Sequence, residues 1–137
     1  MIKIRPHHIL CMRAYQGHGY SKNFEQNMEN IIKEIKTYNK FLKTCNNNEN
    51  INVEIVYSTD SICESCPNKL GENNCETQDK VISIDSKMIK YFFIKEGIHN
   101  YKNLEILVYN NITEDILNDI CRDCNWYSIA NCKDYIL

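Results

Sequence analysis

The sequence predicts an α+β protein that is mostly helical, with a small sheet and two cysteine-rich metal-binding loops. Three observations support this fold class. Apolar residues recur at helical spacing in several segments, of which residues 22–43 form the longest. Apolar and polar residues alternate in residues 51–57, as they do in a half-buried strand. Six of the eight cysteines fall into two groups of nearly identical spacing.

The first half of the chain begins with a short alternating segment, residues 2–4, which predicts an opening strand. Pro6 fits the first turn of a helix that we expect to reach Tyr15. Ser21 is a good N-cap for a helix over residues 22–43. The apolar positions of this long helix recur at helical spacing: they are Phe24, Met28, Ile31, Ile32, Ile35, Tyr38, Phe41 and Leu42.

Residues 51–57 give the clearest strand prediction, because Ile51, Val53, Ile55 and Tyr57 occupy every second position. A helical pattern resumes at Asp85. The residues expected on one face of this helix are Met88, Ile89, Phe92 and Phe93. Gly97 is predicted to end this helix, since glycine readily adopts the left-handed conformation that follows a last turn.

The last third of the chain predicts two more elements. Asn100 can cap a segment over residues 101–109, which is helical in spacing although a strand stays open as an alternative. Thr113 precedes two acidic residues and predicts the start of a final helix that carries Cys121 at its C-terminal end. No linker or change of composition divides the chain, so a single domain over residues 1–137 is expected.

Composition and charge exclude several classes of function. The formal net charge is −2 and no basic stripe is visible, so nucleic acid is not an expected partner. No segment approaches the roughly 20 apolar residues that span a bilayer. The N-terminus lacks the apolar region of a secretory signal, which predicts a cytoplasmic protein. In a reducing compartment, closely spaced thiols are expected to bind metal rather than to form disulfides.

The two cysteine groups predict a metal or iron–sulfur centre. Their spacings are Cys-x2-Cys-x8-Cys and Cys-x2-Cys-x7-Cys. The first group contains Cys63, Cys66 and Cys75, and the second contains Cys121, Cys124 and Cys132. A Cys-x2-Cys turn lets two thiolates reach one metal ion. Each group is one ligand short of the four that a tetrahedral site requires.

The missing ligand is predicted to come from the first helix. Cys11 lies four residues after His7 and three after His8, so all three can project from one helix face. Cys45 has no partner nearby in the sequence and is left out of the ligand set.

Three arrangements of these ligands stay open. A [4Fe–4S] cluster could take the first cysteine group and a fourth ligand such as Cys11. Each group could instead form its own site, completed by Cys11 and by a histidine. In a third arrangement, a zinc-ribbon-like site takes four thiolates, from Cys63, Cys66, Cys121 and Cys124. Thiolates suit both iron and zinc, so residue types do not separate these metals.

Four stretches of the chain stand out together. They are Arg5-Pro6-His7-His8-Ile9-Leu10-Cys11, Gly17-His18-Gly19-Tyr20-Ser21, Asp60-Ser61-Ile62-Cys63 with Cys66-Pro67, and Cys121-Arg122-Asp123-Cys124-Asn125-Trp126. Together they resemble the DUF1284 family of small bacterial and archaeal proteins, over nearly the whole chain. The resemblance implies an iron–sulfur or metal-binding role, with no established activity. It implies ligand positions at Cys11 and at the six cysteines of the two groups, and none at Cys45.

Three functions are compatible with this sequence. The leading expectation is a small iron–sulfur or metal-binding protein that transfers electrons to a redox partner protein or senses redox state. The second is a structural zinc protein that serves as a protein-interaction module. The third is a metal-dependent enzyme in which Arg5, His7 and His8 bind an anionic substrate or exchange protons. No catalytic residue is assigned, because no nucleophile elbow, P-loop or metalloprotease motif is present.

Overall fold

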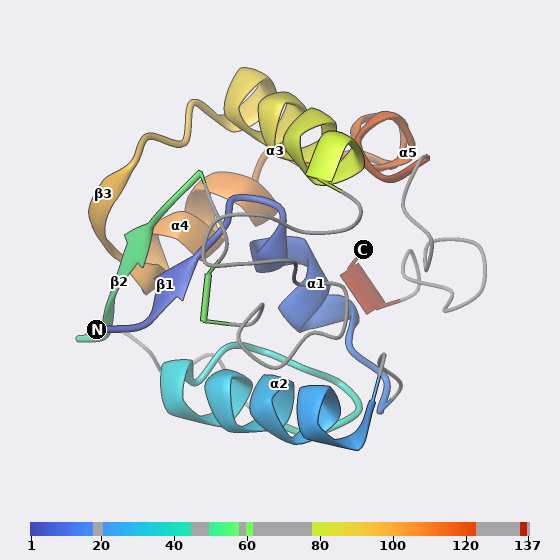
Figure 1. Ribbon diagram of the computed structural model, residues 1–137. Coiled ribbons are helices and arrows are strands. Elements are labelled where there is room, and N and C mark those ends of the chain that lie inside the picture. The colour runs from blue at the N-terminus through green and yellow to red at the C-terminus, as the bar shows by residue number, and fades with distance from the viewer. Residues whose placement is uncertain (18–20, 45–49, 58–59, 62–77, 123–134, 137) are drawn as a thin grey trace.

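The computed structural model describes residues 1–17, 21–44, 50–57, 60–61, 78–122 and 135–136. This part of the chain forms five helices and a small three-stranded sheet, arranged as in Figure 1, which confirms the α+β prediction. In chain order they are β1 (Lys3–Ile4), α1 (His8–Ala14), α2 (Lys22–Ile35), β2 (Asn52–Ile55), α3 (Gln78–Phe92), β3 (Gly97–Asn100), α4 (Tyr101–Tyr109) and α5 (Glu114–Cys121). None of these helices is long and apolar enough to cross a membrane. Apart from Cys121, the two predicted cysteine loops lie outside the described residues.

The sheet has the strand order β1-β2-β3. β1 pairs with β2 in parallel, and β3 pairs with β2 antiparallel, with Ile55 opposite Gly97. Val53 and Ile55 of β2 are fully buried, as the alternating pattern predicted. After β2 the chain returns beside β1, where the Ser61 backbone N–H donates to the Lys3 carbonyl at 3.0 Å. The start of the chain and residues 60–61 are therefore held side by side.

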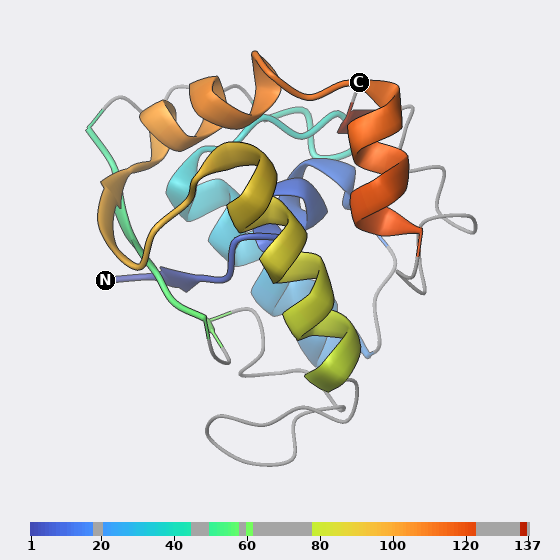
Figure 2. The same ribbon diagram turned by 90° about the horizontal axis from the view of Figure 1, so that it is seen from above.

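Helix α1 lies in the middle of the molecule. In Figure 1, α2 lies below α1 and α3 lies above it, and the view from above in Figure 2 agrees with this order. Ile9, Leu10 and Met12 of α1 are at most 2% exposed. Burial of this many apolar side chains on so short a helix fixes its position by the hydrophobic effect. The side chains at the start of α1 are consequently enclosed by neighbouring elements.

The predicted helix starts are confirmed where a local cap specifies them. The Ser21 hydroxyl accepts the Phe24 backbone N–H at 3.1 Å at the start of α2. Asn100 and Thr113 cap α4 and α5 in the same way. Residues 101–109 are thus helical rather than a strand, and Cys121 is the last residue of α5 as predicted.

The prediction of a helix over residues 22–43 is wrong in its second half, because α2 ends at Ile35. Lys36 adopts a left-handed conformation with φ of 59°, which terminates the helix. Beyond it, the buried Asn39 amide donates to the Met12 and Tyr15 carbonyls at 2.7 and 3.0 Å. The segment after Lys36 therefore supplies hydrogen bonds to the C-terminal end of α1, which a continuous helix would not do.

Helix α3 also ends earlier than predicted. It ends at Phe92, and Phe93 follows in a left-handed conformation with its side chain 79% exposed. The prediction that Phe93 lies on the apolar face is therefore wrong, and so is the prediction that Gly97 ends the helix. Gly97 instead begins β3, a strand that the sequence did not predict. The four residues of β3 are too few to show an alternating pattern, and pairing with β2 specifies them as a strand.

Candidate metal centre

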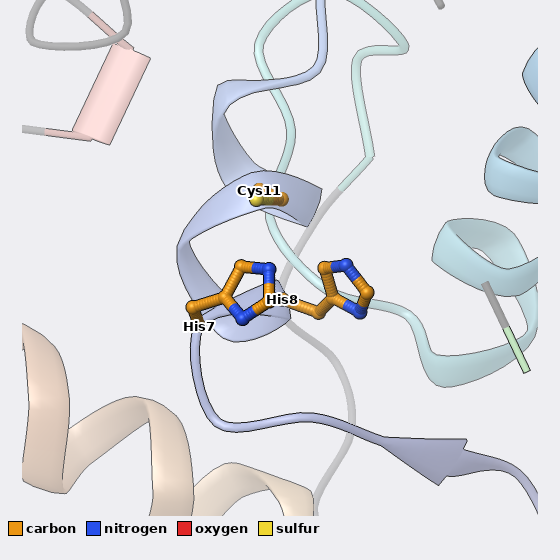
Figure 3. Close-up of side chains that lie close together, drawn as sticks. All are labelled: His7, His8 and Cys11. Carbon is orange, nitrogen blue, oxygen red and sulfur yellow. The ribbon is translucent and has the colours of Figure 1, made fainter. Parts of the chain in front are cut away.

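Three potential metal ligands meet at the start of α1. We call His7, His8 and Cys11 the trio. The Cys11 backbone N–H donates to the His7 carbonyl at 3.2 Å, so Cys11 lies one helical turn after His7. The two imidazole rings are neighbours, with centroids 4.2 Å apart. Figure 3 shows both rings below the Cys11 side chain. One nitrogen of each histidine and the sulfur of Cys11 lie within 4.8 Å of one another.

Asp85 of α3 fixes the first histidine. Its Oδ1 lies 2.5 Å from Nδ1 of His7 and also accepts the His7 backbone N–H at 3.0 Å. Its Oδ2 accepts the Nε–H of Arg5 at 2.8 Å. One buried carboxylate thus joins α3 to the N-terminal end of α1, where the helix dipole favours negative charge. The ring of His7 is oriented with its Nε2 edge away from Asp85.

Asp60 fixes the second histidine in the same manner. Its Oδ2 lies 2.5 Å from Nδ1 of His8 and accepts the Arg5 backbone N–H at 2.6 Å. The Asp60 side chain is fully buried. Histidines that bind metals usually direct their second nitrogen to a carboxylate or carbonyl, which fixes the tautomer and the ring orientation. Both histidines of the trio have this arrangement.

The protonation states suit metal ligation. Burial lowers the pKa of His7, and His8 lowers it further, although Asp85 opposes both effects. Burial by itself would raise the pKa of Asp85, but His7 and Arg5 together lower it to about 2. At neutral pH, Asp85 is therefore ionised and can only accept hydrogen bonds. His7 must then donate its Nδ1–H, which leaves the Nε2 lone pair for a metal ion.

Arg5 is the unusual member of this network. It is fully buried, with its backbone N–H donating to Asp60 and its Nε–H donating to Asp85. Its two terminal nitrogens, Nη1 and Nη2, are buried and make no hydrogen bond within the part of the chain that the structure describes. A buried guanidinium with two unbonded nitrogens is costly unless another group satisfies it.

The structure places one cysteine of the predicted clusters. Cys121, at the end of α5, is buried at 8% exposure. Burial is the main reason that the pKa of Tyr109 is raised, and Cys11 and Cys121 both add to the increase. The other predicted ligands lie outside the described residues: they are Cys63, Cys66, Cys75, Cys124 and Cys132.

Two residues of this site could not be found by sequence reasoning. Asp60 lies 52 positions after His8, and Asp85 lies 78 positions after His7. Asp85 stands in a segment where an acidic residue is ordinary. Asp60 begins one of the four stretches that resemble the DUF1284 family, but no local pattern pairs its carboxylate with a histidine. Only the packing of α3 and of the segment after β2 against α1 brings them to the histidines.

Comparison with known proteins gives one result. A family model described as a protein of unknown function, DUF1284, matches residues 19–130. This span contains five of the six clustered cysteines but begins after the trio and ends before Cys132. No curated protein and no solved structure matches the chain.

Proposed function

The chain belongs to the DUF1284 family, as its motifs predicted, and we propose that it is a metal-binding protein whose metal ion is held by the trio. The main support for this proposal is the pair of buried carboxyl groups that lie within hydrogen-bond distance of the two histidine rings. Asp85 and Asp60 each bond an Nδ1 atom, and one nitrogen of each ring lies within 4.8 Å of the Cys11 sulfur, so we assign the two Nε2 atoms to the metal ion. Such carboxylate–histidine pairs orient metal ligands in proteins.

The ligand types favour zinc at the trio. Zinc binds imidazole nitrogen at about 2.0–2.1 Å and thiolate sulfur at about 2.3 Å, in a tetrahedral arrangement. Ligand atoms around such an ion are about 3.3–3.7 Å apart by this geometry. The trio's ligand atoms lie within 4.8 Å of one another. Side-chain rotations that move these atoms by about 1 Å would bring all three into contact with one zinc ion. Three protein ligands leave one position for a further ligand.

The balance of buried charge supports a bound cation. Asp85 is ionised at neutral pH, and a second buried carboxyl group, that of Asp60, accepts the Arg5 backbone N–H. A divalent metal ion at the trio would place positive charge beside these carboxyl groups. Because uncompensated buried charge costs several kcal/mol, metal binding should stabilise the folded chain.

The clustered cysteines extend the proposal. Cys11 and Cys121 both contribute to the raised pKa of Tyr109, which supports Cys121 as a source for the fourth ligand. The alternative is an iron–sulfur cluster on the clustered cysteines, with Cys11 or a histidine of the trio as a further ligand, and electron transfer or redox sensing as its role. A structural zinc site with four protein ligands would instead favour a protein-interaction module.

The test of this proposal compares His8→Ala with the wild-type chain. We expect His8→Ala to bind zinc at least about 100-fold more weakly, since loss of a supporting group alone costs 10–100-fold. His99→Ala is the matched control. His99 lies on β3, away from the trio, with its Nε2 bonded to the Lys95 carbonyl, and its replacement should leave zinc affinity unchanged. Affinity is measured by competition with a coloured chelator.

Metal analysis of protein purified without oxygen separates zinc from the iron–sulfur alternative. Colourless protein with one zinc per chain and no iron is the expected result. Brown protein that contains iron and acid-labile sulfide would overturn the assignment of zinc. Equal zinc affinity in His8→Ala and wild type would exclude the trio as the site.

A further inference from the structure

We propose that Arg5 forms a subsite for an oxyanion, the carboxylate or phosphate group of a small ligand, beside the trio. The terminal nitrogens of Arg5 would bind two oxygens of this group. The anion subsite depends on the contacts of Arg5 alone. Contact between the same ligand and the metal ion rests on the proposed function.

The position of the Arg5 guanidinium is fixed by its neighbours. Its Nε–H donates to Asp85 Oδ2 at 2.8 Å, and its backbone N–H donates to Asp60 Oδ2 at 2.6 Å. These bonds hold both the main chain and the inner edge of the guanidinium. Arginine binds carboxylates and phosphates through two parallel N–H···O bonds. With Nε committed to Asp85, the pair that is left for this geometry is Nη1 and Nη2.

Burial distinguishes Arg5 from an ordinary surface arginine. The residue is fully buried, and both terminal nitrogens make no hydrogen bond within the described ranges. Leaving such donors unsatisfied costs about 1–3 kcal/mol for each group, and more when the group is charged. Asp85 offers one oxygen to Arg5, since its other oxygen bonds His7. A ligand oxyanion would satisfy both nitrogens at once.

Asp85 also connects the proposed subsite to the trio. The same carboxylate bonds His7 through Oδ1 and Arg5 through Oδ2. Arg5 and the first proposed metal ligand therefore lie on adjacent sides of one side chain. A ligand that carries a carboxylate or phosphate group would bind Arg5 with this group and place a neighbouring atom at the open position of the metal. Planar recognition of this kind needs arginine, because lysine offers a point charge only.

The first experiment follows anion binding in the metal-free full-length chain. Sodium phosphate and sodium acetate are added at constant ionic strength, and side-chain nitrogen resonances of the three arginines are recorded by NMR. We expect a saturable shift at Arg5 with one of the two anions, which also identifies the preferred group, and none at Arg13 or Arg122. Arg5→Lys should weaken the binding by about tenfold or more. Arg122→Lys is the control, because Arg122 is an exposed arginine.

The outcomes separate this inference from the proposed function. No saturable shift at Arg5 with either anion, or equal affinity in Arg5→Lys and wild type, would overturn the subsite. If Arg5→Lys does not fold, the Arg5 resonance of the wild-type chain decides the matter by itself. Zinc binding without an anion response would overturn the subsite alone. An anion response in a chain that binds no zinc would support the subsite and overturn the metal site.

Discussion

Replacing Asp85 by asparagine should lower the free energy of unfolding by about 3–5 kcal/mol, because it removes one partner of a buried ion pair. The change keeps the size of the side chain and removes its charge. Arg5 would then stay buried with no carboxylate on its Nε, and His7 would lose its ionic acceptor. Urea denaturation followed by circular dichroism measures the effect.

Two further variants show whether charge is the cause. Asp115→Asn removes an exposed carboxylate at the start of α5 and should change stability by less than about 1 kcal/mol. In the double variant Arg5→Met with Asp85→Asn, the buried ion pair is replaced by two neutral side chains, so part of the lost stability should return. A double variant less stable than Asp85→Asn itself would show that Arg5 does not need Asp85 as its counter-ion.

The same ion pair determines how the metal-free chain responds to acid. The pKa of Asp85 is lower in the folded chain, at about 2, than its ordinary value of 3.8. The unfolded state thus binds more protons between these values, and the stabilisation is present above pH 3.8 and lost as the pH falls toward 2. Asp85→Asn should lack this part of the acid dependence. An identical loss of stability in both proteins over this range would contradict the assignment.

Replacing Cys11 by serine should cause the largest loss of metal affinity, at least about 100-fold. The change removes the one sulfur ligand of the trio and replaces it with a hydroxyl, which binds zinc far less well than a thiolate does. At a fixed excess of free zinc, a hundredfold weaker site lowers the metal-dependent stabilisation by about 2.7 kcal/mol. Thermal unfolding with and without zinc measures this difference.

The matched control for Cys11→Ser is Cys45→Ser, because Cys45 belongs to neither cysteine cluster. Its zinc affinity should equal that of the wild-type chain. Cys121→Ser tests the fourth position: a loss of affinity would make Cys121 part of the same centre. If Cys11→Ser bound zinc as tightly as Cys45→Ser does, Cys11 would be a structural thiol and the trio would not be a metal site.

Local signals in the sequence were sufficient wherever the determinant is local. The caps at Ser21, Asn100 and Thr113 were predicted, because each hydrogen bond joins residues three positions apart. The juxtaposition of His7 and His8 with Cys11 was predicted for the same reason, since a single helical turn brings them together. These parts of the fold and of the candidate site depend on spacing alone.

Long-range packing decided the rest. Lys36 ends α2 in a left-handed conformation that its residue type does not indicate, and the following segment is specified by the contacts of Asn39 with α1. Strand β3 exists through pairing with β2. Asp60 and Asp85 reach the histidines only because α3 and residues 60–61 pack against the start of α1. The pairing of these carboxylates with His7 and His8 could therefore not be predicted from the sequence.

X-ray absorption at the zinc edge of the loaded full-length chain tests the metal site most directly, because it identifies the atoms bound to the ion. The trio predicts two imidazole nitrogens at about 2.0–2.1 Å and at least one sulfur at about 2.3 Å. The imidazole contribution should decrease in His8→Ala and stay unchanged in His99→Ala. A shell of four sulfur atoms without imidazole would place the metal on the cysteine clusters alone and contradict a site built on His7, His8 and Cys11.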